Sequence, residues 1–153
     1  MIQKLSHKNR SIAKELQTLF RASYAIEAEL LGATDFPPLK RQLESYSESN
    51  NVFYGYFSNG SLAAATEIDE GPDSTHIQSL VVHPDYFRQG IGRALLIFIQ
   101  NAHPSKLYTV ETGAANGPAT ALYRKYGFKE LYQYETDHGI RKVRFEKIIP
   151  DTK

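Results

Sequence analysis

The sequence has no cysteine among its 153 residues, and this absence excludes several kinds of chemistry. Without thiols the chain forms no disulfide, no thiolate metal site and no cysteinyl acyl-enzyme. Five histidines are present, but they lack the H-E-x-x-H spacing or a comparable one, so we expect no metal. The P-loop string G-x-x-x-x-G-K-[ST] is also missing, which excludes that way of binding a nucleotide phosphate.

Long apolar segments and an excess of one charge are lacking as well. Residues 2–5 begin no apolar run typical of a signal peptide or a membrane span, so we expect a cytoplasmic protein with no membrane partner. The net charge is +1 and no basic stripe carries interleaved aromatics, so we expect no nucleic-acid partner. The length and the 41% hydrophobic content predict one domain, residues 1–153. Such a domain buries roughly 70% of its unfolded surface.

Apolar periodicity and turn signals predict the element order β-α-α-β-β-β-α-β-α-β-β. Asn59-Gly60 is a strong signal for a two-residue hairpin turn, and Pro37-Pro38 separates two helices. The expected strands cover residues 2–6, 52–58, 62–68, 76–82, 107–111, 131–136 and 140–148, and the expected helices cover residues 12–32, 39–47, 94–102 and the segment that follows 116–119.

The stretch HPDYFRQGIGRALL, residues 83–96, places Gly90 and Gly92 directly before a helix-like apolar run. Glycines let the backbone pass close to a ligand, and the free N–H groups of a helix start favour an anion such as phosphate. The dinucleotide fingerprint G-x-G-x-x-G/A is an alternative, since the strand 107–111 ends in an acid about twenty residues on. However, Leu95 occupies the third small position, and seven residues separate the upstream strand from Gly90, so we set that alternative aside.

Two segments carry a family resemblance. Residues 89–94 match Q/R-x-x-G-x-G/A, which resembles the acyl-CoA pyrophosphate loop of the GCN5-related N-acetyltransferases, the GNAT superfamily. Residues 80–88 look like that family's strand, V-x-P turn and basic residue. Residues 116–128 are similar to its segment N-x-x-A-x-x-L-Y-x-x-x-G-F. Together the matches span about residues 77–128 in the family's order.

The resemblance implies an α/β fold: a central twisted mixed sheet with splayed central parallel strands and helices on both faces. The splayed strands would be 76–82 and 107–111. Splaying leaves backbone N–H and C=O groups without partners, and the amides of the pantetheine arm of acetyl-CoA would supply them. The residues implied to hold acetyl-CoA are Leu80, Val81, Val82, Arg88, Gln89, Gly90, Ile91, Gly92, Arg93, Ala94, Asn116, Ala119 and Tyr123.

The implied reaction is acetyl transfer to an amine by direct attack. A lysine-like amine has a pKa of about 10.4, so fewer than about one in a thousand is neutral at pH 7. A base near the amine is therefore expected, and Glu67 is the first candidate, since a carboxylate buried beside a cleft gains proton affinity. Glu111, at a strand end, is the second. Tyr123 stands where many family members carry the tyrosine that protonates the departing thiolate; its alternative is a packing residue of the helix face.

The acceptor is expected to be a primary amine of a small molecule, an amino acid or a peptide. In the family the region between the first two helices often borders the acceptor pocket, so Tyr24, Asp35, Phe36 and Leu39 are candidates by position, beside Glu67 and Glu111. Local packing is the alternative for Phe36. A homodimer is compatible with the resemblance. The alternative function is a non-catalytic acyl-CoA-binding sensor or interaction module.

Overall fold

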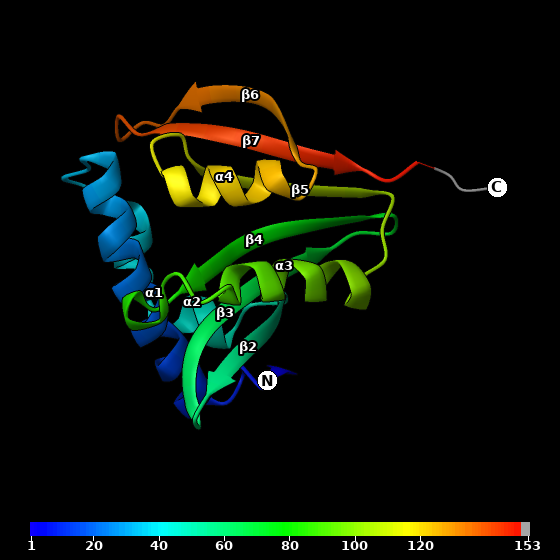
Figure 1. Cartoon of the computed structure of the whole chain (residues 1–153). Helices are drawn as coiled ribbons and strands as arrows, with labels where there is room; N and C mark the ends of the chain where they lie inside the picture. Colours follow the sequence, from blue (N-terminus) through cyan, green and yellow to red (C-terminus); the bar gives the residue numbers. More distant parts are fainter. Residues whose placement is uncertain (151–153) are drawn as a thin grey trace.

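The computed structural model describes residues 1–150 and has the predicted order of helices and strands (Figure 1). Its elements are β1 (Ile2–Lys4), α1 (Arg10–Leu31), the 3₁₀ helix η1 (Pro37–Lys40), α2 (Leu43–Ser47), β2 (Val52–Ser58), β3 (Ser61–Glu70), β4 (Ser74–Val82), the 3₁₀ helix η2 (Pro84–Tyr86), α3 (Ile91–Ala102), β5 (Leu107–Gly113), α4 (Gly117–Lys125), β6 (Lys129–Glu135) and β7 (Arg141–Ile148). The hairpin turn is confirmed, because Asn59 and Gly60 both have positive φ, at 51° and 81°.

The strands form one mixed sheet in the order β1-β2-β3-β4-β5-β7-β6, and only β4 and β5 pair in parallel. Their pairing runs from Ser74 with Leu107 to Ile77 with Val110 and then stops. Figure 1 shows the two strands together at one end and apart at the other. The predicted splay of the two central parallel strands is therefore confirmed, and it opens the sheet at its middle.

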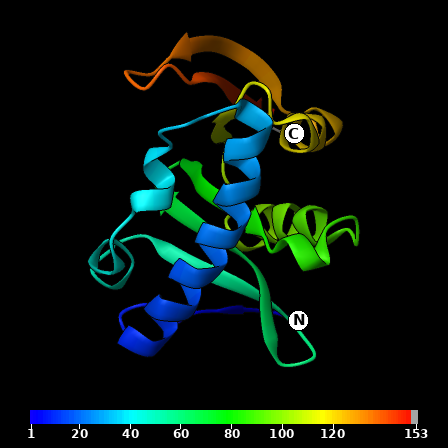
Figure 2. The same ribbon diagram turned by 90° about the vertical axis from the view of Figure 1, so that its left-hand side faces the viewer.

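Helices cover both faces of the sheet, and each face has its own apolar core. Under α1 and α2, the fully buried side chains include Leu16, Phe20 and Phe53. Under α3 and α4, they include Leu96 and Phe145. Figure 2 shows α1 in front of β2, β3 and β4, and the C-terminal half of this helix reaches the place where the strands diverge. The gap in the sheet is thus closed from one side by α1 and bordered on the other by α3 and α4.

The segment 39–47 differs from the expected single helix. It is η1 followed by α2, and the break falls at Arg41, whose φ of −59° and ψ of 126° are not helical. The Arg41 guanidinium instead bonds the Glu67 carboxylate of β3, with Nη1 2.7 Å from Oε1. A tertiary ion pair therefore interrupts a segment whose local sequence is compatible with a helix.

Candidate functional site

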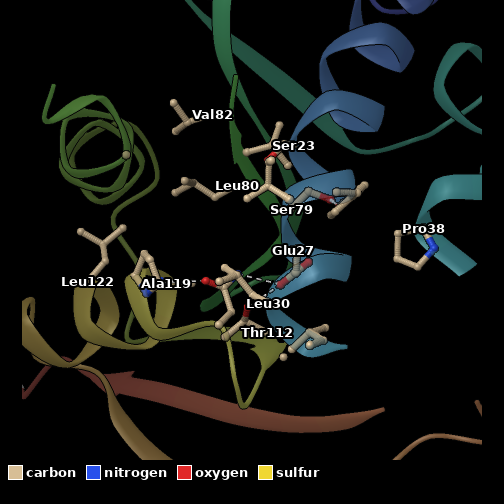
Figure 3. Close-up of a pocket in the computed structure, with 18 of the residues that line it drawn as sticks. Ser23, Glu27, Leu30, Pro38, Ser79, Leu80, Val82, Thr112, Ala119 and Leu122 are labelled. Carbon is tan, nitrogen blue, oxygen red and sulfur yellow. Dashed lines mark hydrogen bonds between the residues drawn. The ribbon is translucent and has the colours of Figure 1, made fainter. Parts of the chain in front are cut away.

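The diverging strands enclose a cavity of about 1140 Å³. Its walls come from β4, β5, the C-terminal half of α1, η1, the N-terminus of α3, α4 and the β6–β7 loop. Figure 3 shows Leu80 and Val82 of β4 on one side and Ala119 and Leu122 of α4 on the other. Beyond Ile77 no strand among residues 1–150 pairs with the edge of β4 that faces β5, so backbone groups along this edge have no sheet partner there.

The glycine loop lies at one end of this cavity. His83 caps η2, and the chain then turns through Arg88 and Gly90, which have left-handed φ values of 64° and 75°. Gly90 is the N-cap of α3, and no side chain in the described part of the chain, residues 1–150, caps the helix. The first N–H groups of α3 are therefore free to bind an anion, assisted by the partial positive charge of the helix start.

We predict that Gly92→Val raises the dissociation constant of acetyl-CoA about tenfold or more, while the fold survives. A Cβ at Gly92 would make only ordinary contacts, 3.5 Å to Leu122 and 3.7 Å to Leu80, but the added methyl groups would fill the cavity between β4 and α4. Gly92→Ala is the matched smaller change. Gly90→Val would not isolate the effect on binding, because any L side chain is strained at the φ of 75° and the loop itself would change. Calorimetric titration measures the effect, and unchanged binding in Gly92→Val would make this glycine a structural turn only.

Most of the residues implied to hold acetyl-CoA border this one cavity. Those that line it are Leu80, Val81, Val82, Arg88, Gly90, Ile91, Gly92, Arg93, Asn116, Ala119 and Tyr123. Gln89 and Ala94 do not line it. Ala94 is already in the first turn of α3, where its N–H donates to the Gly90 carbonyl at 3.0 Å.

Tyr123 combines a packing role with access to the cavity. Its side chain is only 4% exposed, and its ring contacts Phe128 and Phe145 at centroid distances of 5.6 and 5.9 Å. The residue still lines the cavity, and its hydroxyl makes no hydrogen bond with any of residues 1–150. Burial, and then the negative charge of Glu27, raises the pKa of Tyr123 above its ordinary value. The phenol therefore keeps its proton at neutral pH, and the raised pKa makes it a weaker acid than an exposed tyrosine.

Glu67 is buried as expected, but its surroundings differ from the expected ones. The carboxylate is 3% exposed and is held by Arg41 at 2.7 and 3.2 Å and by Asn51 at 2.9 Å. Ser79 donates to it at 3.3 Å from the neighbouring strand. Arg41 and Ser79 line the cavity, whereas Glu67 does not. Glu67 is therefore paired and lies behind Ser79 instead of at the cavity wall, and its role as base stays a prediction.

Glu111 lines the cavity on β5, and it is also paired. Arg144 donates to its Oε2 at 2.7 Å, and the Tyr134 hydroxyl donates to its Oε1. Burial alone would raise the pKa of Glu111, but these two hydrogen bonds and the charge of Lys142 outweigh burial and lower the pKa. A carboxyl group with a lowered pKa is a weaker base.

The acceptor candidates in α1 and in the segment between α1 and α2 divide into two groups. Tyr24 and Phe36 line the cavity and pack edge to face at 5.9 Å, and the Tyr24 hydroxyl donates to Ser79 Oγ at 3.3 Å. Asp35 and Leu39 do not line it. Asp35 instead pairs with Lys40 and His138, and Leu39 packs in a small cluster that includes Phe36. Phe36 thus packs locally and also faces the cavity.

Glu27 of α1 is a cavity residue that sequence reasoning missed. Its Oε2 accepts hydrogen bonds from Thr112 Oγ1 at 3.1 Å and from Asn116 Nδ2 at 2.8 Å, shown as dashed lines in Figure 3. These partners lie more than eighty residues away along the chain, where no local pattern links them to α1. One signal was available: Glu27 follows Tyr24 by three residues, which puts both on one face of the helix.

Within residues 1–150 no group of three or more His, Asp or Glu side chains is arranged to hold a metal ion. No helix in that part of the chain is both long and apolar enough to cross a membrane.

Comparison with known proteins identifies one family and one fold. The acetyltransferase (GNAT) domain family matches residues 27–149. The [ribosomal protein bS18]-alanine N-acetyltransferase of Escherichia coli is 33% identical over 112 residues, 71% of this chain and 74% of that protein. The Bacillus subtilis protein YqkA, of the group UPF0157, is 35% identical over 142 residues. This covers 92% of the chain but only 41% of the length of YqkA.

Solved structures share the architecture over nearly the whole chain. The crystal structure of the Escherichia coli S18-alanine N-acetyltransferase aligns with a TM-score of 0.77 at 22% identity, covering 100% of this chain and 96% of that one. The PaiA N-acetyltransferase of Thermoplasma acidophilum, crystallised with coenzyme A, aligns with a TM-score of 0.74 at 20% identity, covering 97% and 98%.

Proposed function

This chain belongs to the GNAT acetyltransferase family, and from that premise we propose that it transfers an acetyl group from acetyl-CoA to a primary amine by direct attack. The acceptor class is a small-molecule, amino-acid or peptide amine. The Escherichia coli relative is named for acetylating an alanine of a ribosomal protein, which supports a peptide amine among these.

The proposal rests on one observation: the unpaired edge of β4 and the glycine loop at Gly90 border the same cavity. The edge of β4 beyond Ile77 offers backbone donors and acceptors to the amides of a pantetheine arm. The uncapped start of α3 at Gly90 offers N–H groups to a pyrophosphate. Arg88 and Arg93 line the same end and add positive charge. The related structure that contains coenzyme A supports this use of the fold.

Tyr123 is proposed to serve the leaving group. When the amine nitrogen forms its bond to the acetyl carbon, the carbon–sulfur bond breaks and the sulfur takes up negative charge. Tyr123 lines the cavity and is protonated at neutral pH, so its hydroxyl can donate to the sulfur as negative charge builds up there. Its packing against Phe128 and Phe145 fixes the direction in which the hydroxyl points.

The base has two candidates. Glu111 borders the cavity, which supports it over Glu67, but its bonds to Arg144 and Tyr134 weaken it. Glu67 reaches the cavity only through Ser79. We therefore propose that orientation of the two reactants supplies most of the rate, with the proton passing from the amine to water or to Glu111.

The alternative function, an acyl-CoA-binding module without acceptor chemistry, is separated from the enzyme by one experiment. Acetyl-CoA is incubated with the protein and a panel of primary amines and N-terminal alanine peptides, and free thiol release and product mass are measured. Amine-dependent thiol release with a 1:1 acetylated product is the expected result. If the protein binds acetyl-CoA tightly but free thiol appears no faster than in a control without protein, the acyl-CoA-binding module is favoured.

A further inference from the structure

The carboxylate of Glu27 stands apart from the other acids around the cavity. Glu67 is paired with Arg41 and Glu111 with Arg144. Glu27 lines the cavity and forms no ion pair with any cationic side chain of residues 1–150. Of the two carboxylates that line the cavity, Glu111 is paired with Arg144, whereas Glu27 has no cationic partner within residues 1–150.

The hydrogen bonds to Glu27 orient the carboxylate without neutralising it. Thr112 and Asn116 both donate to Oε2, while Oε1 has no hydrogen-bond partner within residues 1–150. Thr112 is buried on β5, and the side chain of Asn116 also caps α4, where its Oδ1 accepts from Ala119 N at 3.3 Å. Both donors thus belong to rigid elements, so Oε1 is held in place and open to a positively charged donor.

The surroundings of Glu27 place it at the reacting end of the cavity. Figure 3 shows its side chain reaching from α1 toward Thr112. Glu27 and Tyr123 line the same cavity, and Asn116, which donates to Glu27, is the N-cap of the helix that carries Tyr123. Leu30 and Phe36, together with Pro38, line the neighbouring wall. Glu27 is half-buried, and at such a site a carboxylate attracts an ammonium ion more strongly than it does in bulk water.

We propose that Glu27 binds the acceptor amine in its ammonium form, and that the acceptor is a cationic primary amine carried on an apolar group. This inference rests on the proposed function. The apolar group lies against Leu30, Phe36 and Pro38, while the ammonium is held at Oε1 until it loses its proton to solvent and attacks. Glu27 is thereby a specificity-determining residue: it selects amines that are charged before reaction.

A pair of isomeric amines tests this selection. Phenethylamine is an ammonium ion at neutral pH, whereas 4-ethylaniline has the same atoms but a neutral amine. In Glu27→Gln we expect kcat/KM for phenethylamine to fall about 10- to 100-fold, mainly through KM, because a charge-assisted hydrogen bond is lost. The same variant should change kcat/KM for 4-ethylaniline less than about threefold, and it should leave acetyl-CoA affinity unchanged. Glu29→Gln, an exposed acid on the same helix, is the matched control and should alter neither amine.

The outcomes separate this inference from the proposed function. Equal losses for the two amines, or no loss for phenethylamine, would overturn the role of Glu27 while leaving acetyl transfer intact. If wild-type protein acetylates neither amine, calorimetric binding of phenethylammonium to the acetyl-CoA complex decides the question. Binding that weakens at least tenfold in Glu27→Gln supports the ammonium site, whereas no binding by wild type, or equal binding by both proteins, overturns it.

Discussion

Tyr123→Phe should lower kcat by about 10² to 10⁴, the range expected for a lost general acid, and leave the affinity for acetyl-CoA nearly unchanged. The substitution keeps the ring and therefore its contacts with Phe128 and Phe145. It removes only the hydroxyl of a residue that lines the cavity. Turnover with the best amine of the panel and calorimetry with acetyl-CoA measure the two quantities separately.

Tyr126→Phe is the matched control for that experiment. Tyr126 follows Tyr123 by three residues, caps the C-terminus of α4 and does not line the cavity. Loss of its hydroxyl should change kcat less than about twofold. Full activity in Tyr123→Phe would make Tyr123 a packing residue, and the proton for the sulfur would then come from water or another donor.

Arg41→Met should destabilise the fold by about 3 to 5 kcal/mol, the usual cost of leaving a buried charge without its partner. The Glu67 side chain is 3% exposed and Arg41 18%, so little solvent reaches the carboxylate once the guanidinium is gone. Arg41 also lies over the Tyr46 ring at 4.0 Å, and this contact is lost with it. The free energy of unfolding is measured by urea titration.

A second substitution shows whether the lost stability comes from the unpaired charge of Glu67 or from the lost packing of Arg41. Arg41→Met combined with Glu67→Gln removes both charges and keeps the amide within reach of Asn51 and Ser79. The double variant should recover more than half of the lost stability, because the buried charge is gone. A cost below about 1 kcal/mol for Arg41→Met alone would mean that the pair is solvated like a surface ion pair.

Local sequence patterns predicted most of the fold. The apolar spacing of α1 and the turn at Asn59-Gly60 depend on neighbours in the chain, and both are found. The break at Arg41 was not predictable in this way, because its cause is Glu67, twenty-six residues further on. A local pattern carries no information about such a partner.

The same distinction applies to the site. The loop at Gly90 and the segment at Asn116 are recognisable because each is contiguous, and the structure brings both to one cavity. Glu67 sits among apolar residues, which predicts its burial but not the guanidinium that neutralises it. Glu27 becomes recognisable as a site residue only through its hydrogen bond from Thr112, and this contact forms only when α1 packs across the splayed strands.

The central claim is that acetyl-CoA lies between β4 and β5 with its pyrophosphate at the start of α3. Hydrogen–deuterium exchange of the protein with and without saturating acetyl-CoA tests it most directly. We predict that exchange slows about tenfold or more at the β5-facing N–H groups of residues 78–82 and at residues 91–93, with no change in β2. Protection confined to other segments, or saturable binding that leaves residues 78–82 unchanged, would contradict the placement.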